Sequence, residues 1–522
     1  MYDAQRTNGA TLPFWYRDVA TSTPTGHAWP DAQIDVIVIG AGITGLSTAY
    51  HLLRAGRSVL VLDKGQIGSG ETGRTTAHLA TGLDDHYTEL ARIHGHRGAR
   101  LAAESHAAAI DSIAEVVARE GIACDFSRVD GYLFAGSPRD HRLLEQELEA
   151  ARRVGLDVAA CDAAPLPFAS GPAVRFANQA QLQPLAYLEG LARAVRAAGG
   201  LIRTGVRVER VEEGTPVRVH VDGGAVATAG ALVVATNSPI VDVFAMHTKQ
   251  AAYRSYVIAL PIPKGSVARA LYWDTLDPYH YLRLAGDDDV LILGGEDHKV
   301  GQSDAPEEAW TRLERWARDR FPGAGAVAQR WSGQVWEPAD GLAFIGRNPG
   351  TAKNVFICTG DSGNGMTHGT IAGLLLTDLI CERTNPWRDL YDPSRKIVQP
   401  RAAREFVREN LNVAMAYGDW LKPAQKRVAE IEPGHGAVVR RGAHRVALYV
   451  DERGVEHACS AVCPHLGGLV SWNRAERSWD CPCHGSRFDP YGRVLTGPAK
   501  RDLANRDEGE RPSEPVPPPS AE

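Results

Sequence analysis

Asp35-Val-Ile-Val-Ile-Gly40-Ala-Gly42-Ile-Thr-Gly45 joins a nearly all-apolar run to a glycine-rich turn. The apolar run predicts a parallel strand buried on both faces. Apolar residues then recur at helical spacing until Gly56, and a second apolar run, 58–62, ends at Asp63. A lone Gly-x-Gly-x-x-Gly is weak evidence, but strand, turn, helix, strand and acidic residue in this order predict a dinucleotide-binding unit.

Each glycine of the turn, and the acidic residue after the second run, has a physical role in holding a dinucleotide. Gly40 makes the tight turn, Gly42 lets the backbone approach a pyrophosphate at the helix N-terminus, and Gly45 permits close packing of helix and strand. Asp63 is placed to accept a hydrogen bond from a ribose hydroxyl, and its charge disfavours the 2′-phosphate of NADP. The candidate cofactor contacts of this unit are Gly40, Ala41, Gly42, Thr44, Gly45, Asp63 and Lys64.

A second informative stretch lies near the C-terminus, where Cys463-Pro-His465 is followed by Cys481-Pro-Cys-His484. Zinc sites usually pair their cysteines as Cys-x-x-Cys, whereas a Rieske [2Fe–2S] cluster takes two Cys on one iron and two His on the other. Each half-site here supplies one Cys and one His, and nearby glycines offer N–H donors to the sulfurs. The stretch resembles the Rieske family signature, which implies Cys463, His465, Cys481 and His484 as cluster ligands.

Two departures from the Rieske proteins of membrane complexes concern the surroundings of the cluster. Those proteins pair two further cysteines in a disulfide, but here Gly468 stands opposite Cys483, so that disulfide cannot form. High-potential members also carry a Tyr where this chain has Phe488, and loss of that donor lowers the potential. We therefore expect a low-to-middle potential within the range of about −150 to +300 mV. A redox titration with a midpoint above about +200 mV would contradict this expectation.

The segment from Gly68 to His78 (GSGETGRTTAH) resembles the second flavin-contact loop of the D-amino-acid-oxidase-like family, which includes glycine oxidase and sarcosine oxidase. The resemblance implies FAD as cofactor, with Arg74, Thr75 and Thr76 in contact with it. It leaves two roles open for His78, a covalent bond to FAD or a hydrogen bond near the flavin. Further along, it implies that backbone atoms near Val208 contact the adenine.

A second glycine-rich turn, 359–367, follows a short apolar run and opens a long helix. Such a turn offers N–H groups and the positive end of a helix dipole. In the resembled family it lies at the pyrimidine end of the flavin, where negative charge collects on reduction. The resemblance therefore implies flavin contacts at Gly363, Asn364, Gly365, Met366 and Thr367.

Composition excludes several classes of protein. With 522 residues, 23% charged residues and a net charge of −6, the chain has no basic excess for nucleic acid. No apolar run is long enough for a membrane span, and the first residues lack the pattern of a signal peptide. Eight cysteines without a disulfide rhythm fit a reducing compartment. We expect a cytoplasmic protein without a membrane anchor.

The expected fold is α/β followed by β. It comprises a lead-in (1–33) with Trp15 packing on the domain behind it, a Rossmann-like FAD-binding domain with an antiparallel substrate domain (34–385), a helical connector (386–428), an all-β Rieske domain (429–505) and a disordered tail (506–522). Within the second part we expect helices over 84–120, one strand over 201–212 and a surface turn at 294–299.

Candidate substrate-binding residues lie on the strands expected between 250 and 335. The candidates for binding a substrate carboxylate are Arg254, Tyr256, Tyr281 and Arg283. Arg283 is preferred, because an Arg pairs bidentately with a carboxylate. Oxidation of an amine in this family needs orientation more than a strong base, so no base is assigned.

With both resemblances together, the chain resembles bacterial FAD-dependent oxidoreductases that carry a C-terminal Rieske domain. The first reading is a dehydrogenase that oxidises an amine or amino acid and passes electrons singly through the cluster to an external acceptor. The second reverses the flow, with a ferredoxin-like donor reducing the flavin through the cluster. The third is an oxidase that uses oxygen, whose Rieske module senses redox state or docks a partner. A Rieske oxygenase would need a separate iron held by two His and a carboxylate, and the sequence offers no convincing triad.

Overall fold

The first of two large sheets has a largely parallel core. The computed structural model describes residues 8–17, 19, 29, 33–241, 244–396, 400–416 and 430–506. Among these, eight strands form this sheet in the order β16-β17-β10-β1-β2-β7, with β9 and β8 continuing from β10. The five from β17 to β7 run parallel, as the apolar character of β1 and β2 predicts. The bounds are β1 Ile34–Ile39, β2 Val59–Leu62, β7 Leu201–Arg203, β8 Val208–Glu212, β9 Val217–Val221, β10 Val226–Val234, β16 Phe344–Arg347 and β17 Val355–Thr359.

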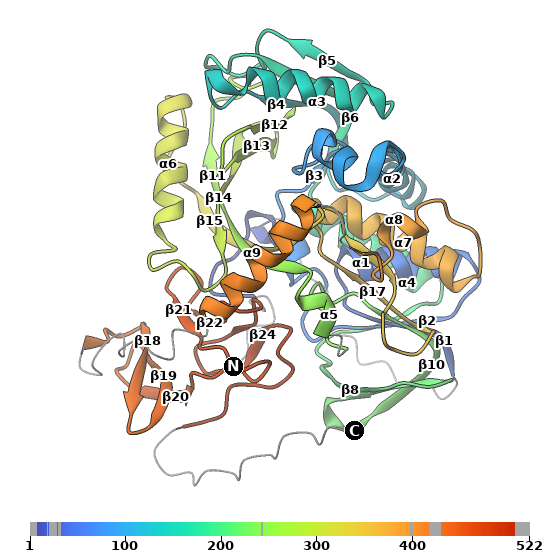
Figure 1. Cartoon of the computed structure of the whole chain (residues 1–522), viewed down its shortest axis with the longest axis vertical. Helices are drawn as coiled ribbons and strands as arrows, with labels where there is room; N and C mark the ends of the chain where they lie inside the picture. The colour runs from blue at the N-terminus through green and yellow to red at the C-terminus, as the bar shows by residue number, and fades with distance from the viewer. Residues whose placement is uncertain are drawn as a thin grey trace.

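Helices α1 (Ile43–Arg54) and α7 (Gly365–Ile380) pack against each other beside this sheet (Figure 1). Glycines of α7 permit the close approach. A Cβ atom at Gly373 would lie 2.2 Å from Ser47 Oγ, and one at Gly369 would lie 3.1 Å from the Thr44 nitrogen. Because α1 follows β1 and α7 follows β17, both helices begin at the carboxyl edge of the parallel strands, where ligands bind in such folds. The neighbouring helices are α2 Tyr87–Glu120, α4 Pro184–Ala197 and α8 Arg388–Tyr391.

The second large sheet contains nine strands of the described chain, in the order β15-β11-β14-β13-β12-β4-β6-β3, with β5 on β6. All pairs are antiparallel except β12 with β4. The bounds are β3 His78–Leu79, β4 Ser127–Phe134, β5 Val158–Cys161, β6 Ala173–Gln181, β11 Gln250–Pro261, β12 Leu271–Asp274, β13 His280–Ala285, β14 Val290–Lys299 and β15 Gln329–Pro338. We call residues 33–396, which hold both sheets, the two-sheet module.

Two local expectations were wrong. The run 201–212 forms two strands, β7 and β8, because the chain turns at Gly205 with a φ of 72°. Residues 294–299 form no surface turn but extend β14, which pairs with β11 as far as Lys299 opposite Tyr253. The broad α/β architecture with an antiparallel substrate sheet is confirmed.

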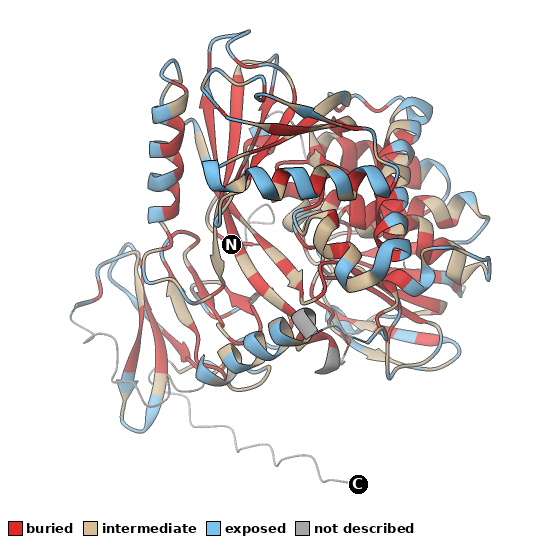
Figure 2. Ribbon diagram, turned by 45° about the horizontal axis from the view of Figure 1, so that its top comes forward, coloured by how far each residue is buried: buried red, intermediate tan, exposed pale blue. Residues whose placement is uncertain are grey.

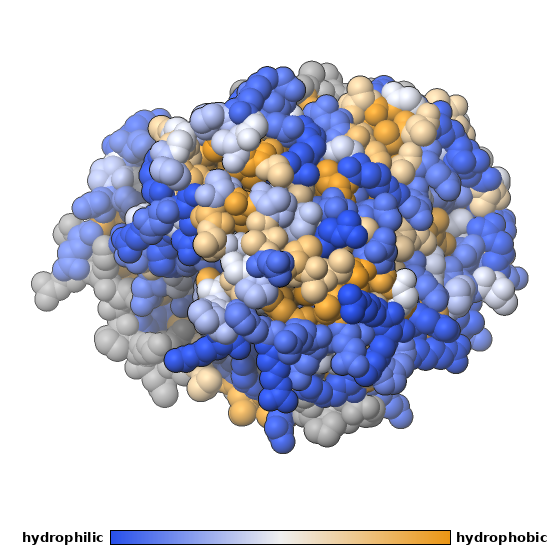
Figure 3. All heavy atoms as spheres, turned by 90° about the horizontal axis from the view of Figure 1, so that it is seen from above, coloured by the Kyte–Doolittle hydropathy of each residue, from blue (hydrophilic) through white to orange (hydrophobic). Residues whose placement is uncertain are grey.

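Amphipathic helices cover the second sheet. Figure 2 shows α3 (His141–Arg153) and α6 (Glu308–Arg320) with one buried and one exposed face each. On α6 the buried side includes Trp310, Leu313 and Trp316, which join the core under β11 and β14. Seen from above, the face over this sheet is mostly hydrophilic, with apolar side chains gathered near its middle (Figure 3). Of the described helices, none is long and apolar enough to cross a membrane.

Residues 430–506 form a small all-β unit, which we call the C-terminal module (Figure 1). Its outer sheet has the order β18-β19-β20 and its inner sheet the order β21-β22-β23-β24. Trp479 and Phe488, both fully buried, lie in the core of the module beside four of its cysteines. The bounds are β18 Gly436–Arg441, β19 His444–Val450, β20 Glu456–Ser460, β21 Ser471–Asn473, β22 Ser478–Asp480, β23 Arg487–Phe488 and β24 Val494–Thr496.

The segments that flank the two-sheet module join it to the C-terminal module. Trp15, in the short helix Phe14–Arg17, is buried, and its Nε1 donates to the Thr75 carbonyl at 2.7 Å, as the lead-in was expected to pack. Helix α9 (Pro400–Ala416) crosses between the modules, and its Val413 packs on the C-terminal core. The expected disordered tail and the end of the connector, 507–522 and 417–429, lie outside the described residues.

Candidate functional site

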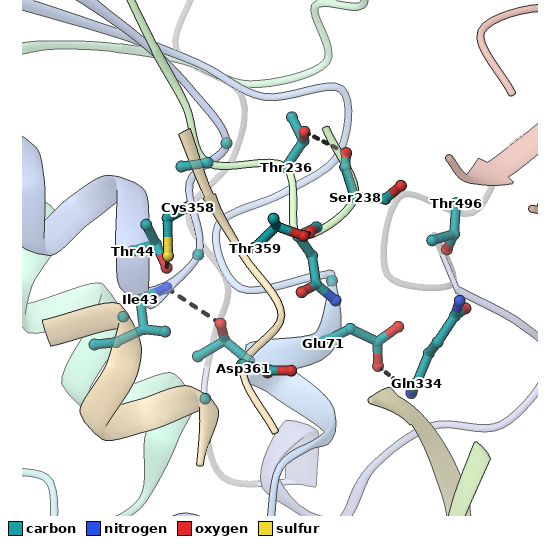
Figure 4. A pocket seen from close by; sticks show the side chains of 18 of the residues that line it. Ile43, Thr44, Glu71, Thr236, Ser238, Gln334, Cys358, Thr359, Asp361 and Thr496 are labelled. Carbon is teal, nitrogen blue, oxygen red and sulfur yellow. Dashed lines mark hydrogen bonds between the residues drawn. The ribbon is translucent and has the colours of Figure 1, made fainter. Parts of the chain in front are cut away.

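A cavity of about 560 Å³ lies where the carboxyl edge of the first sheet meets the second sheet and the C-terminal module. Figure 4 shows side chains from all three parts around it. Most of the predicted cofactor contacts line this cavity, namely Gly40, Gly42, Thr44, Asp63, Lys64, Arg74, Thr75, Thr76, Val208, Gly363, Asn364, Gly365 and Met366. Ala41, Gly45 and Thr367 do not.

The first glycine-rich turn has the geometry that its sequence predicts. Gly40 has a φ of +115° and donates its N–H to the Leu62 carbonyl at 2.7 Å. A Cβ atom at Gly45 would lie 1.8 Å from the Gly40 oxygen, so Gly45 acts in packing behind the turn. Asp63 accepts the N–H groups of Ala41 at 2.6 Å and Gly65 at 2.7 Å. The turn and the acidic residue are therefore held as one unit at the cavity edge.

The second loop contributes its backbone and its hydroxyls more than its charge. The Arg74 side chain is buried, and its Nη1 donates to the Ser332 carbonyl at 2.6 Å and its Nη2 to the Thr11 carbonyl at 2.7 Å. Arg74 Nη1 also lies 3.2 Å from Glu476 Oε1. The guanidinium thus binds the C-terminal module and the N-terminal segment. Arg74 still lines the cavity, so the predicted cofactor contact would have to come from atoms of Arg74 other than the guanidinium.

His78 lies on the cavity with both ring nitrogens near protein partners. Its Nδ1 is 3.0 Å from Thr76 Oγ1 and its Nε2 is 3.3 Å from the Leu282 carbonyl oxygen. Burial, with a smaller effect from the Arg283 charge, lowers the pKa of His78 to about 3, so the ring is neutral. These contacts favour a hydrogen-bonded role over a covalent one.

The C-terminal glycine-rich turn brings the start of α7 to the cavity. Gly363 has a φ of 69°, and Asn364 caps α7 without a side-chain hydrogen bond to the helix. The first N–H groups of the helix therefore face the cavity edge without a side-chain cap. Thr367 points elsewhere, since its Oγ1 lies 2.8 Å from Nδ1 of buried His106. The Thr367 side chain therefore faces the core, and a cofactor contact at Thr367 would be limited to its backbone N–H in the first turn of α7.

Four buried polar atoms of the cavity lining have no partner within the described protein. They are Asn237 Nδ2, Ser238 Oγ, Gln334 Oε1 and His368 Nε2. Unpaired buried polar groups are costly, so a ligand with several polar groups along its length is the expected partner. A long cavity with a glycine-rich turn at each of two helix N-termini fits the two phosphates and the ring system of FAD.

One end of the cavity is aromatic and acidic. Tyr281 Oη lies 2.7 Å from Ser255 Oγ, and Tyr279 Oη donates to Asp84 Oδ2 at 3.0 Å. Trp273 completes this lining. The Asp84 side chain is exposed to the cavity, and the protein atoms around it and then the nearby Asp85 raise its pKa to about 7. A cation bound here would stabilise the ionised carboxylate.

Of the three predicted catalytic residues, only Tyr281 lines the cavity. Tyr256 is fully buried on the other face of β11, with its Oη 2.9 Å from His298 Nε2. Arg283 is 2% exposed and donates to the carbonyls of Thr76 at 2.5 Å and Leu182 at 2.8 Å. The predicted substrate-binding roles of Tyr256 and Arg283 are therefore corrected to structural ones. Arg254 likewise donates its Nε to Ser332 Oγ and pairs with Glu476.

The four predicted cluster ligands meet between two loops of the C-terminal module. Cys463 and His465 lie between β20 and β21, and Cys481 and His484 lie between β22 and β23. The two imidazole rings are 5.1 Å apart, and both cysteines are buried. No three His, Cys, Asp or Glu side chains converge on one point in the described chain. Each loop supplies one Cys and one His, which together are the donor set that a Rieske cluster takes.

The surroundings of these ligands match the sequence reading. A Cβ atom at Gly468 would lie 2.5 Å from Cys483 Sγ, so Gly468 stands where a second cysteine would complete a disulfide. None of the eight cysteines, which all lie in the described ranges, forms a disulfide. Phe488 is fully buried and offers no hydroxyl to a sulfur. The low-to-middle potential stays a prediction.

Contacts between the cluster loops and the cavity were not predicted from the sequence. Gln334 lines the cavity, and its Nε2 donates to the Gly485 carbonyl at 2.9 Å, next to His484. The His247 ring lies 5.1 Å from the His465 ring. Gln334 alternates with apolar neighbours on β15, but no local pattern reveals a partner 151 positions away.

A buried charge network fastens the two modules. Glu476 of the C-terminal module is fully buried and lies 3.2 Å from Arg74 Nη1 and 3.1 Å from Arg254 Nη2. Thr11 donates both its N–H, at 3.0 Å, and its hydroxyl, at 2.6 Å, to Glu476. Burial alone would raise the pKa of Glu476, but Arg74, Arg254 and Arg487 lower it to about 2. The carboxylate is therefore ionised, and the docked arrangement is electrostatically specific.

Comparison with known proteins matches both halves of the chain. The family described as FAD dependent oxidoreductase (DAO) matches residues 35–379, and the Rieske [2Fe-2S] domain family matches residues 422–507. A relative in Bacillus subtilis (strain 168), described as a Rieske 2Fe-2S iron-sulfur protein and named YhfW, is 31% identical over 501 residues. The match covers 95% of this chain and 98% of that one.

More distant relatives cover the two-sheet module. Gamma-glutamylputrescine oxidoreductase of Escherichia coli (strain K12) is 27% identical over 362 residues, or 66% of this chain and 83% of that one. The structure of glycine oxidase from Geobacillus kaustophilus has a TM-score of 0.60 at 18% identity, covering 70% of this chain and 100% of that one. This last likeness concerns the fold.

Proposed function

Because the chain belongs to the FAD dependent oxidoreductase (DAO) family and carries a Rieske [2Fe-2S] domain, we propose that it oxidises a C–N bond of an amine or amino acid and delivers the electrons singly to an external acceptor. When bound, FAD supplies two-electron oxidation and the cluster supplies one-electron transfer, so each turnover reduces a one-electron acceptor twice. The substrate loses two electrons and two protons to become an imine, which water hydrolyses. The observation that carries the proposal is the direct contact between the cavity and the cluster loop.

That contact supports an electron path within one chain. Gln334 lines the cavity and binds the Gly485 carbonyl, and Gly485 adjoins the cluster ligand His484. Trp336, two residues further on β15, is fully buried, and a Cβ atom at Gly485 would lie 3.3 Å from its ring. Dense packing of this kind excludes water and keeps the two cofactor sites in a fixed relation.

The acidic end of the cavity supports an amine as the substrate. Asp84 and Asp361 line the cavity, whereas the guanidinium groups of Arg283 and Arg254 are bound to protein partners away from it. A carboxylate attracts an ammonium group, and an α-carboxylate of a substrate would be repelled. Tyr279 and Tyr281 would orient the carbon chain of the substrate against the flavin. The name of the E. coli relative, which contains the amine putrescine, is consistent with this class.

The electron acceptor belongs to the same proposal. The absence of a disulfide among the described cysteines suits a reducing compartment, so we expect a cytoplasmic acceptor, such as a small redox protein. Two alternatives differ from this proposal. In one, a ferredoxin-like donor reduces the flavin through the cluster, and in the other, an oxidase uses oxygen and its Rieske module senses redox state. The experiment below distinguishes all three.

The test is anaerobic reduction of the holoprotein with a panel of amines and amino acids, followed by visible and EPR spectra. The proposal predicts that an amine bleaches the flavin and that the Rieske EPR signal then appears. Bleaching without a cluster signal would favour the oxidase, and reduction by dithionite but by no amine would favour the reductase.

A matched variant tests the contact itself. In Gln334→Leu the amine should still bleach the flavin, but the EPR signal should appear several-fold more slowly, because the link to Gly485 is lost. Gln146→Leu, at an exposed position of α3 in the two-sheet module, serves as the control. Equal rates in both variants would contradict a path through Gln334.

A further inference from the structure

One wall of the cavity comes from the C-terminal module. Strand β24 and the loop after it contribute Val494, Leu495, Thr496, Gly497, Ala499 and Lys500 to the lining. We call residues 494–500 the wall segment. We propose that the wall segment is part of the FAD-binding site, closing the cavity over the adenosine half of the cofactor, so that FAD is retained only while the C-terminal module is docked.

The wall segment is tied to the residues around the predicted ribose site. Lys64, which follows Asp63, donates its Nζ to the Leu495 carbonyl. Arg207 Nη2 donates to the Lys500 carbonyl at 2.7 Å, and both Lys64 and Arg207 also line the cavity. The adenosine end is thus bounded on one side by the two-sheet module and on the other by the wall segment.

A further tie lies just outside the cavity. Asp502 accepts the Val494 N–H at 2.9 Å and pairs with Arg207 Nη1 at 3.2 Å. Asp502 does not line the cavity, so it acts on the wall segment only by positioning it. A change at Asp502 therefore alters the position of the wall segment without removing a side chain that lines the cavity.

The wall segment also covers polar groups that have no partner. Ser238 Oγ is fully buried and unpaired, and a Cβ atom at Gly497 would lie 3.4 Å from it. Figure 4 shows Ser238, Thr496 and Gln334 around the same space. A dinucleotide enclosed here would supply partners to Ser238 and to the unpaired Oε1 of Gln334.

The wall segment is coupled to the cluster loop and to the docked interface. The Ala499 N–H donates to Ser486 Oγ at 3.0 Å, and Ser486 lies two residues after His484. The interface itself depends on Glu476, which is buried between Arg74 and Arg254. Release of the module would therefore remove one wall of the FAD site. The inference rests on FAD as the resident cofactor and not on the identity of the substrate.

The first test narrows the cavity from the wall. Thr496→Trp places a large side chain on the wall, and Arg493→Trp places the same side chain at an exposed position of the module outside the cavity lining. After removal of FAD, titration of each protein with FAD by flavin fluorescence should give a Kd at least tenfold higher for Thr496→Trp and unchanged for Arg493→Trp. An unchanged Kd for Thr496→Trp would overturn the proposal.

The second test separates the adenosine half from the flavin half. Asp502→Ala should raise the Kd for FAD several-fold and leave the Kd for FMN, which lacks adenosine, unchanged. Equal effects on both flavins, or on neither, would contradict a wall over the adenosine half.

The third test opens the interface at a distance from the wall segment. Glu476→Gln should accelerate FAD dissociation at least tenfold, while an intact Rieske EPR spectrum shows that the module is folded. Arg441→Ala, on the outer sheet and paired with Glu456, is the control. Small-angle scattering shows whether the module of the variant has undocked. If it has undocked and FAD still dissociates as slowly as from the parent protein, the proposal is overturned.

Discussion

The two ends of the cavity differ in charge and in origin. The end around Asp63, here called the basic end, is closed by the C-terminal module and carries four cations beside three carboxylates. The cations are Lys64, Arg207, Arg210 and Lys500, and the carboxylates are Asp63, Glu209 and Glu213. The other end carries Asp84 and aromatic side chains, all from the two-sheet module. Cations available for phosphates at one end, and a carboxylate among aromatic rings at the other, would orient an anionic cofactor and a cationic substrate. Because of this difference, we expect a substitution at one end to change the binding of one ligand and to leave the binding of the other nearly unchanged.

The largest expected effect is at the acidic end. Asp84 is exposed to the cavity, and Asp84→Asn removes the charge that would face a substrate ammonium. Once the substrate fills the cavity and excludes water, loss of one partner of that ion pair costs about 2–5 kcal/mol. We expect kcat/KM for amines to fall about 100-fold or more, which corresponds to ~2.7 kcal/mol. Steady-state kinetics with a one-electron acceptor measures this.

The comparison requires that the basic end be unaffected by this change. FAD content of Asp84→Asn should match that of the parent protein, and Asp287→Asn, at an exposed salt bridge with Lys264, should alter neither property. An Asp84→Asn enzyme that keeps its amine kinetics would remove the acidic end from substrate binding.

The next effect is at the basic end. Asp63 holds two N–H groups of the turn and is placed to bind the ribose. Hydrogen bonds to charged groups contribute about 1.5–3 kcal/mol, so Asp63→Asn should weaken FAD binding about 10- to 100-fold. Titration of the FAD-free protein measures the Kd. In the FAD-saturated variant, preference among amines should be unchanged, and a changed preference would show that the two ends are not independent.

The distance along the chain between interacting residues explains what the sequence could predict. The turn at Gly40 and the loops at Cys463 and Cys481 were predicted because their chemistry depends on residues close together in the chain. Tyr256 was misassigned because a strand pattern does not reveal which face of the sheet meets the cavity. Arg283 shares its face of β13 with Tyr281, but it lies further along the strand, where the carbonyls of Thr76 and Leu182 take its donors. Gln334 and Glu476 were missed because their partners lie far away in sequence and on another module.

A smaller effect is expected from pH. The pKa of Asp84 is raised to about 7 by the protein atoms around it and by Asp85. Only the ionised carboxylate attracts an ammonium group, and kcat/KM reports the free enzyme. As pH falls below about 7, Asp84 takes up a proton, so kcat/KM should fall about tenfold for each pH unit. The FAD Kd should not follow this profile. A kcat/KM for amines that stays flat between pH 5 and pH 8, at a constant ammonium fraction, would contradict the assignment.

The smallest functional effect is expected at Arg283, whose charge lies outside both ends. Arg283 is buried, donates to the carbonyls of Thr76 and Leu182, and lies over the Trp15 ring. Arg283→Met leaves two buried carbonyls without these donors, which costs about 1–3 kcal/mol for each group and lowers the melting temperature. The ratio of kcat/KM between amines and amino acids should stay within about twofold, since the guanidinium does not reach the cavity. A selective loss of activity toward amino acids would restore Arg283 as a carboxylate ligand, and the acidic end would then bind the amine of an amino acid.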